Sequence, residues 1–268
     1  MSNAPSARTP APRTPAWPPK SAPRLFVEEE LGEGSLVTLE GTQAHYLGKV
    51  MRVKADDTVI LCDNLTGEWA ARVSQVEKRQ IDLIVTDRLR EREEVPDLWL
   101  CPALLKKDRF DLVLEKATEL GIARIMPVIT RRCVADRLNT ARASTITVEA
   151  AEQCARTALP ELAEPVKLET LLKDWPSDRA LFFADEEGGG DAAAAFDAAG
   201  APAAILIGPE GGFDDQERAA IRAHPSARAI TLGPRILRGE TAAIAALSLW
   251  MGSAGDWGRL GADWSNEE

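Results

Sequence analysis

Two short apolar runs toward the C-terminal end of the chain, 203–207 and 227–232, each end at a Gly-Pro pair. Bounded apolar runs of this length are typical of buried strands, and the Gly-Pro pairs indicate sharp turns where the strands end. A helical pattern follows each turn, so the segment 203–252 predicts two β-loop-α units side by side. Open α/β sheets bind ligands at the carboxyl ends of neighbouring strands. The two glycine-rich loops at these ends are therefore the candidate site.

The first loop, 208–212, reads GPEGG. Its three glycines let backbone N–H groups approach a ligand without an intervening Cβ atom. Asp214 and Glu217 fit a capping box at the start of the next helix. The loop lacks the Lys-Ser/Thr pair of a P-loop and is not GxGxxG, so a phosphate cradle has little support. For this loop taken alone, a plain strand-to-helix turn is the alternative.

The second loop, 232–241, reads LGPRILRGET and precedes an alanine-rich helix expected over 242–251. Arg235, Arg238 and Glu240 stand among its glycines. Charged residues on a loop held by a rigid scaffold often carry function, whereas a solvated loop whose charges pair with one another is the alternative. The small side chains of the helix indicate close packing against another segment of backbone.

The N-terminal part of the chain has a different composition. Residues 1–23 are rich in Pro, Ala and Ser and contain no acid, so they cannot bury enough apolar surface to fold. We predict a disordered tail there, with a weak basic contact to RNA as the alternative. Between 24 and 90, five short strands and one helix at about 43–52 predict a small β-barrel. The charged segment 87–97 contains Pro96 and predicts a linker.

Beyond the linker, strand and helix patterns alternate. We expect a strand over 98–105, an amphipathic helix ending at Gly121, a strand over 123–129 and a helix over 141–158. This alternation predicts an α/β domain with a central parallel sheet. The expected ranges are 1–23 for the tail, 24–90 for the β-barrel, 97–255 for the α/β domain and 256–268 for a C-terminal tail.

Composition narrows the functional classes. The net charge of −10 argues against a nucleic-acid partner, but the acidic residues cluster in short runs, so a basic face can exist elsewhere. Four widely spaced cysteines without a CxxC pair fit reduced thiols in a cytoplasmic protein, and the cysteines and two histidines do not suggest a metal site. No apolar run approaches the roughly 18 residues of a membrane helix.

Taken together, LIGPEGG at 206–212 and LGPRILRGETA at 232–242 resemble the SPOUT class of RNA methyltransferases, and within it the RsmE family. Weaker matches are HYLGKVMR at 45–52 and the helix that contains EKATELG. The resemblance implies S-adenosylmethionine as cofactor, methylation of N3 of a uridine in 16S ribosomal RNA, a PUA-like RNA-binding barrel and a homodimer. The RNA substrate is either free or part of the assembled small subunit. It also implies a trefoil knot, which general topology rules would argue against.

The resemblance assigns residues to three roles. The cofactor would lie against Leu206, Ile207, Gly208, Pro209, Glu210, Gly211, Gly212, Leu232, Gly233, Pro234, Arg235, Ile236 and Leu237. The catalytic candidates are Arg238, Glu210, Glu240 and Thr241. The RNA-binding candidates are Arg24, His45, Lys49, Arg52, Lys106, Arg109, Arg131, Arg132 and Arg156.

The expected chemistry constrains these roles. Methyl transfer needs the acceptor nitrogen in line with the S–CH₃ bond, so positioning is a large part of catalysis. Because uracil N3 carries a proton, a base must remove it or a cation must stabilise the resulting anion. We favour Arg238 for orientation and charge stabilisation. Glu210 and Glu240 are weaker candidates for the base, and either can instead hold the geometry of its loop.

The basic residues outside the two loops also have simpler explanations. By i, i+4, i+7 spacing, His45, Lys49 and Arg52 would share one helical face and hold phosphates, or form a solvated surface. Arg156 is four residues after Glu152, so a helix salt bridge is an alternative to a role at the site or the dimer interface.

Three other functions stay open at this point. One is ribose 2′-O methylation by a related SPOUT enzyme. The others are a non-catalytic RNA-binding protein and an α/β enzyme that binds a nucleotide or phosphate.

Overall fold

The computed structural model describes residues 22–259. The tail predicted at 1–23 and the one at 256–268 therefore lie mostly outside the described residues. The chain divides into two compact units between Glu91 and Arg92, and each unit is described by itself. Among the described residues, no helix has the length and apolar character needed to cross a membrane.

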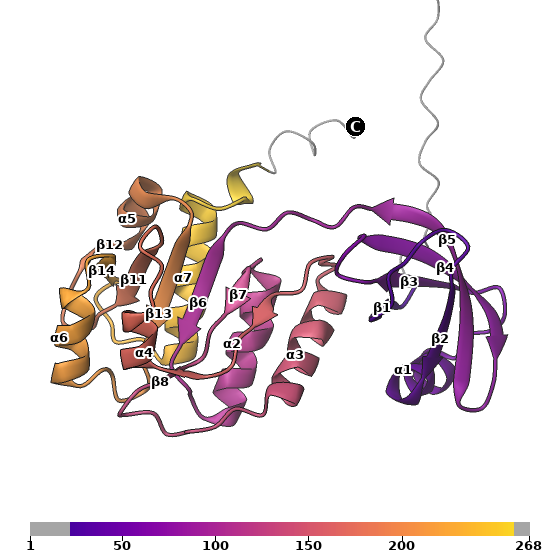
Figure 1. The fold of residues 1–268 in the computed structure, drawn as a ribbon, viewed down its shortest axis with the longest axis horizontal. Coiled ribbons are helices and arrows are strands. Elements are labelled where there is room, and N and C mark those ends of the chain that lie inside the picture. The colour runs from indigo at the N-terminus through magenta and orange to yellow at the C-terminus, as the bar shows by residue number, and fades with distance from the viewer. Residues whose placement is uncertain (1–21, 260–268) are drawn as a thin grey trace, which may run out of the picture. The chain divides into compact units, whose positions relative to one another are not determined.

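The N-terminal unit is a β-sheet curled around its own core (Figure 1). Within the described residues the sheet has five strands in the order β1-β3-β4-β5-β2, antiparallel except for the β1–β3 pair. The elements are β1 (Arg24–Phe26), β2 (Leu36–Glu40), α1 (Gly41–His45), η1 (Tyr46–Met51), β3 (Thr58–Cys62), β4 (Glu68–Val76) and β5 (Gln80–Arg90). The edge strands β1 and β2 are not paired with each other in this sheet, so the predicted barrel is an open sheet that wraps its core.

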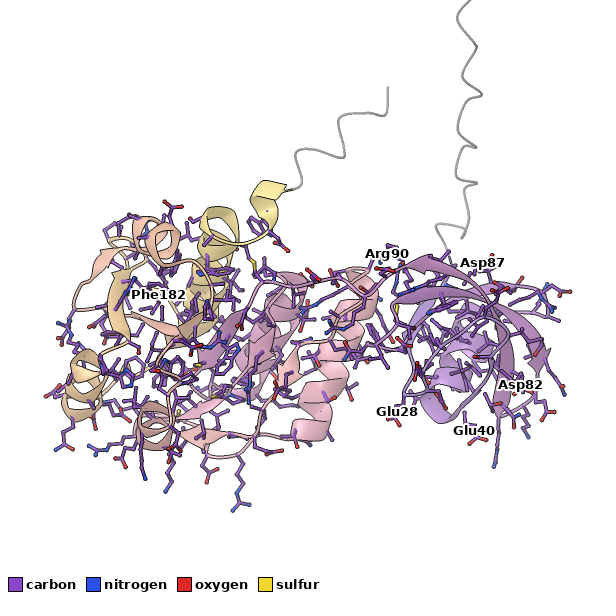
Figure 2. The ribbon with its side chains drawn as sticks, turned by 45° about the horizontal axis from the view of Figure 1, so that its top comes forward. Glu28, Glu40, Asp82, Asp87, Arg90 and Phe182 are labelled. Atoms are coloured by element: carbon purple, nitrogen blue, oxygen red, sulfur yellow. The ribbon has the colours of Figure 1, made fainter. Side chains whose placement is uncertain are left out.

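The core explains the curl of this sheet. Alternate residues of the strands point inward, and Leu61, Val73 and Leu83 are fully buried together with Leu47 from η1. β5 extends to Arg90 because it pairs with β4 as far as Glu68. Acidic side chains such as Glu28, Glu40 and Asp87 are exposed on this unit (Figure 2).

The helix predicted at 43–52 is a short α-helix followed by a π-helix. Its last expected residue, Arg52, lies outside the helix in the left-handed conformation, with φ 58°. Since a π-helix has wider turns than an α-helix, the i, i+4, i+7 spacing does not carry Arg52 onto the face of His45 and Lys49. The prediction of one shared helical face was wrong, although all three side chains are exposed.

The C-terminal unit is an α/β domain with a parallel sheet, as predicted. Among the described residues the sheet has seven strands in the order β12-β14-β11-β13-β6-β7-β9, and β8 pairs with β10 separately. Its strands are β6 (Leu98–Pro102), β7 (Arg124–Ile125), β8 (Val128–Ile129), β9 (Glu161–Leu162), β10 (Val166–Lys167), β11 (Ala180–Ala184), β12 (Gly190–Asp191), β13 (Ala203–Ile207) and β14 (Ala227–Thr231). Its helices are α2 (Lys107–Glu119), α3 (Thr140–Gln153), α4 (Leu168–Lys173), α5 (Ala192–Ala199), α6 (Asp215–Ala223), α7 (Gly239–Ser253) and the 3₁₀ turn η2 (Trp257–Arg259).

The helices cover both faces of the sheet (Figure 1). Helices α2, α3, α5 and α7 pack on one face, where Phe182 and Trp250 are fully buried. Helices α4 and α6 pack on the other face, around Leu206 and Phe213. Apolar residues on both sides of each central strand explain why these strands read as continuous apolar runs.

Several expected elements of this unit have other bounds in the structure. The strand expected over 98–105 ends at Pro102. The strand predicted at 123–129 is broken at Pro127, which has no N–H to donate to a ladder, and β8 then leaves the main sheet. The helix predicted at 141–158 ends at Gln153, and Ala155 adopts a positive φ of 60°. Arg156 therefore lies beyond the helix.

The chain path brings the two predicted loops together. β11 lies between β13 and β14, so the chain crosses to the far side of β11 and returns with α7. At the start of α7, a Cβ on Gly239 would lie 3.0 Å from Leu105 and 3.3 Å from the carbonyl oxygen of Gly208. A side chain at position 239 would therefore require Leu105 and the first loop to shift by a few tenths of an ångström. The trefoil knot stays a prediction from the resemblance.

Candidate functional site

A cavity of about 420 Å³ opens at the carboxyl ends of β11, β13 and β14. Its walls are the first loop, 208–212, and the second loop, which contributes residues 232–237 and Gly239. Its size is within the range of small-molecule and cofactor sites. The structure therefore has a cavity at the carboxyl ends of these strands, where the sequence predicted the site.

The residues predicted to contact the cofactor line this cavity with one exception. The lining ones are Ile207, Gly208, Pro209, Glu210, Gly211, Gly212, Leu232, Gly233, Pro234, Arg235, Ile236 and Leu237. Leu206 is the exception and a correction. Because successive residues of a strand point to opposite faces, Leu206 is buried in the cluster with Phe213 and Ile221, on the opposite face of the sheet from Ile207.

The sequence reasoning missed other parts of the cavity wall. The additional lining residues are Ala184, Asp185, Glu186, Ile230, Thr231, Gly239 and Ala242. Ala184 is the last residue of β11, and Asp185 and Glu186 follow it directly. The missing information was that β11 is the strand between β13 and β14.

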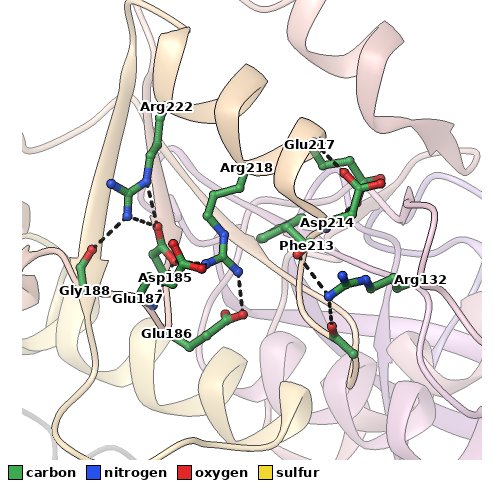
Figure 3. Close-up of polar contacts among 11 residues, drawn as sticks. Arg132, Asp185, Glu186, Glu187, Gly188, Phe213, Asp214, Glu217, Arg218 and Arg222 are labelled. Carbon is green, nitrogen blue, oxygen red and sulfur yellow. Dashed lines mark hydrogen bonds and ion pairs between the residues drawn. The ribbon is translucent and has the colours of Figure 1, made fainter.

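The acidic part of the wall is neutralised by helix α6 (Figure 3). Arg222 donates to Asp185 at 2.6 and 3.0 Å, and Arg218 donates to Glu186 at 2.6 Å. The side chain of Asp185 is 1% exposed, whereas that of Glu186 is 40% exposed. A Cβ on Gly212 would lie only 2.5 Å from Glu186 Oε1, so the first loop lies directly against this carboxylate.

The first loop has a fixed conformation. The N–H of Gly212, with φ 66°, donates to the carbonyl of Pro209 at 2.9 Å and closes a turn. Asp214 and Glu217 form the predicted capping box, with bonds of 2.7 and 3.1 Å. The backbone N–H of Glu217 donates to the Asp214 carboxylate and lowers the pKa of Asp214. Phe213, 2% exposed, packs beneath Gly208.

The catalytic candidates form two groups. Arg109 of α2 links the loops, because its guanidinium lies 3.2 Å from Glu210 Oε1 and 3.8 Å from Glu240 Oε1. Glu240 is 8% exposed, and its Oε2 has no hydrogen-bond partner among the described residues. Arg238 and Thr241, at the start of α7, are exposed. The pairing with Arg109 supports a role of both glutamates in loop geometry, which the sequence left as an alternative to catalysis.

Two of the RNA-binding candidates, Arg156 and Arg24, have partners inside the protein, and the structure corrects the prediction for Arg156. Arg156 is 4% exposed, its guanidinium donates to the carbonyls of Thr118 and Ile122 at 2.8 and 2.6 Å, and burial lowers its pKa to about 10. Arg24 pairs with the buried carboxylate of Glu68, and its side chain is 19% exposed. Buried Arg156 is therefore not available to phosphates, whereas Arg24 is partly exposed and its role in RNA binding stays a prediction.

Arg131 and Arg132 also have partners in the protein. Arg131 donates to Asp214 at 3.0 Å, which raises the pKa of Arg131, and its backbone N–H donates to Glu217 at 2.7 Å. Arg132 donates to the carbonyls of Gly211 and Phe213. His45, Lys49, Arg52 and Lys106 are exposed, and a role in RNA binding stays a prediction for them.

No group of three or more potential metal ligands occurs within residues 22–259. Cys62 and Cys101 are buried, and burial raises the pKa of each thiol to about 12. The cavity wall offers backbone groups, apolar side chains, one arginine (Arg235) and three acidic residues (Asp185, Glu186 and Glu210).

Comparisons with known proteins identify the family of this architecture. A family model for an RNA methyltransferase domain matches residues 91–251, and one for an RNA methyltransferase PUA domain matches residues 39–86. The ribosomal RNA small subunit methyltransferase E of Synechocystis sp. is 31% identical over 84% of this chain and 76% of its own length. The protein of the same name from Rickettsia conorii is 29% identical over 84% of this chain and 93% of its own length.

Solved structures agree with the sequence comparison. Ribosomal RNA small subunit methyltransferase E from Neisseria gonorrhoeae, bound to S-adenosyl methionine, is 28% identical with a TM-score of 0.81, over 88% of this chain and 99% of that chain. A Legionella pneumophila protein in complex with the same cofactor is 30% identical with a TM-score of 0.77, over the same shares. Two loops that enclose a cavity, a parallel sheet, a PUA-type unit and these relatives together place the chain in the ribosomal RNA small subunit methyltransferase E family of RNA methyltransferases, which has the SPOUT-type fold.

Proposed function

We propose that this protein transfers a methyl group from S-adenosylmethionine to N3 of a uridine in 16S ribosomal RNA. The observation that supports this most is the cavity between the two loops. An exposed arginine, Arg238, lies at the end of the second loop, where helix α7 begins. The family membership supports the reaction class. We further propose that the protein acts as a homodimer in the cytoplasm, on either free RNA or the assembled small subunit.

The residues of the cavity fit the cofactor. Gly208, Gly211 and Gly212 expose backbone groups to it, and Ile207 and Leu237 supply apolar surface for an adenine ring. Bound S-adenosylmethionine supplies an activated methyl group on a sulfonium. The protein's share of the chemistry is to exclude water, orient the uracil and manage the N3 proton.

Arg238 is the residue that we assign to the uracil. When N3 loses its proton, negative charge spreads to the two flanking carbonyl oxygens, and a guanidinium stabilises it there. Glu210 lines the cavity and is the candidate to accept the proton, provided that it exchanges its contact with Arg109 for one with the substrate. Glu240 is buried behind the loop and keeps Arg109 in place.

The test is methyl transfer from labelled S-adenosylmethionine to small ribosomal subunits that lack the modification. Nucleosides of the product are identified by mass spectrometry, with fully modified subunits as the control. N3-methyluridine at one site is the expected result. A methyl group on a ribose would keep the family and overturn the acceptor, and cofactor binding without transfer to any RNA would overturn the proposed reaction.

A further inference from the structure

We propose that Arg132 is a positioning residue for the cofactor, which acts by holding the first loop in shape, and that it does not bind RNA. The inference rests on the proposed function only in that S-adenosylmethionine occupies the cavity. It assigns a role in cofactor binding to a side chain that lies outside the two glycine-rich loops.

The contacts of Arg132 are with the backbone of the first loop and its continuation (Figure 3). Its Nη1 donates to the carbonyl oxygen of Gly211 at 2.9 Å and to that of Phe213 at 3.4 Å. A Cβ on Gly211 would lie 3.4 Å from the Cβ and 3.5 Å from the Cδ of Arg132, so the loop also rests on the aliphatic part of the side chain. One arginine thus holds the loop by two carbonyls and by direct packing.

These contacts determine which backbone groups the loop presents to the cavity. Gly211 and Gly212 line the cavity, and glycine residues have wide conformational freedom when nothing fixes them. A guanidinium that donates to two carbonyl oxygens on the outer side of the loop removes part of this freedom. Ordering a loop before a ligand arrives improves affinity, because the entropy cost of ordering is no longer part of binding.

The segment that carries Arg132 is itself fixed to the same helix start. The backbone N–H of Arg131 donates to Glu217 Oε1, while Glu217 Oε2 accepts from the N–H of Asp214. The break at Pro127 makes this possible, since β8 leaves the main sheet and pairs with β10. Residues 130–132 therefore form a support for the first loop that comes from about 80 residues earlier in the chain.

The alternative is that Arg132 contacts an RNA phosphate, and the two roles have opposite consequences. A phosphate contact contributes to RNA affinity and to its salt dependence. A loop support contributes to cofactor affinity in the absence of RNA. Measuring S-adenosylmethionine binding to the full-length protein without RNA therefore separates the two roles.

The experiment compares Arg132→Ala and Arg132→Lys with wild type. The control is Arg137→Ala, an exposed arginine on the same segment. S-adenosylmethionine binding is measured by calorimetry, RNA binding with a 16S fragment, thermal unfolding by circular dichroism, and kcat and KM for the cofactor on small subunits. Arg132 is exposed, so its variants are expected to unfold within a few degrees of wild type.

We expect Arg132→Ala to weaken S-adenosylmethionine binding about 10-fold, since losing about 1.4 kcal/mol from two hydrogen bonds corresponds to that factor. KM for the cofactor should rise more than kcat falls, RNA affinity should stay within about 2-fold, and Arg132→Lys should recover part of the loss by donating to one carbonyl. Unchanged cofactor affinity, or a loss in RNA affinity alone, would overturn the inference. Wild-type protein that fails to bind S-adenosylmethionine would overturn the proposed function and this inference together.

Discussion

The two loops of the cavity differ in how firmly the rest of the protein holds them. The first loop, 208–212, has a closed turn, a buried phenylalanine beneath it, a capping box after it and Arg132 outside it. The second loop, 232–241, has exposed side chains at Arg235, Ile236 and Arg238, and Ile236 is 90% exposed. The same cavity thus has one preformed wall and one wall whose side chains are free to contact a substrate.

This difference suggests a division of roles between the loops. A wall that is ordered in advance suits the cofactor, which every reaction cycle uses in the same way. Exposed arginines and an exposed apolar side chain suit a large polyanion that arrives from solvent. Substitutions at the first loop should therefore affect stability and cofactor binding, whereas substitutions in the second loop should affect turnover.

The largest expected effect on stability is at Phe213, directly after the first loop and packed beneath it. Phe213→Ala removes a ring that packs beneath Gly208 and against the α4–α6 face of the sheet, and should lower the free energy of unfolding by about 3–5 kcal/mol. Urea denaturation of the full chain measures this. Phe213→Leu, which keeps most of the volume, should lose clearly less; an equal loss would mean that the ring is not the support of this loop.

The largest expected effect on turnover is in the second loop. Arg238→Ala should lower kcat by about 10² to 10³-fold, because a cation aimed at developing charge acts mainly in the transition state. Affinity for S-adenosylmethionine should change little, since the side chain is exposed. Single-turnover methylation and calorimetry measure the two quantities. If cofactor affinity fell with kcat unchanged, Arg238 would belong to cofactor binding and the division of roles would be wrong.

A smaller effect is expected from Gly212→Ala. Its φ of 66° strains any L side chain by roughly 1–2 kcal/mol, and the new Cβ would collide with Glu186 at 2.5 Å. We expect about 10-fold weaker S-adenosylmethionine binding. Gly34→Ala in the N-terminal unit, with φ 80° and no neighbour within 4 Å, carries backbone strain without the collision. Gly34→Ala should lower the stability of the protein and leave cofactor affinity unchanged. If Gly34→Ala and Gly212→Ala both weakened cofactor binding, backbone strain and not the contact with Glu186 would be the cause.

Much of this architecture was predictable because the relevant signals are local in the sequence. The β13 and β14 runs, their glycine loops and the Asp214–Glu217 capping box read directly as strand, turn and helix start. The sequence motif did not reveal which residues of a strand face the cavity. Leu206 was assigned to the cavity although its neighbour Ile207 is the one that faces it, since a motif gives no register between adjacent residues.

The other misses depended on contacts between distant segments. Arg156 looked like an available cation, but it is buried against Thr118 and Ile122 because α3 ends early and the chain turns inward. Asp185 and Glu186 were visible only as an acidic run, because their place in the cavity wall depends on the strand order. The order of strands in a sheet and the contacts of a buried side chain are properties of the folded chain. Residue spacing within a single sequence does not determine them.

The smallest expected effect on stability is that of Ile236→Ala, since a side chain that is 90% exposed contributes within about 0.5 kcal/mol to the free energy of unfolding. Its expected effect is on function, because a large apolar group in solvent beside two arginines is suited to covering a bound base or cofactor. Turnover on small subunits should fall several-fold with an unchanged melting temperature. The matched control is Leu249→Ala. Leu249 is also an exposed apolar residue, but it lies on α7 and does not line the cavity. If Ile236→Ala lowered the melting temperature by several degrees, the second loop would be as firmly held as the first, and the contrast between the two walls would fail.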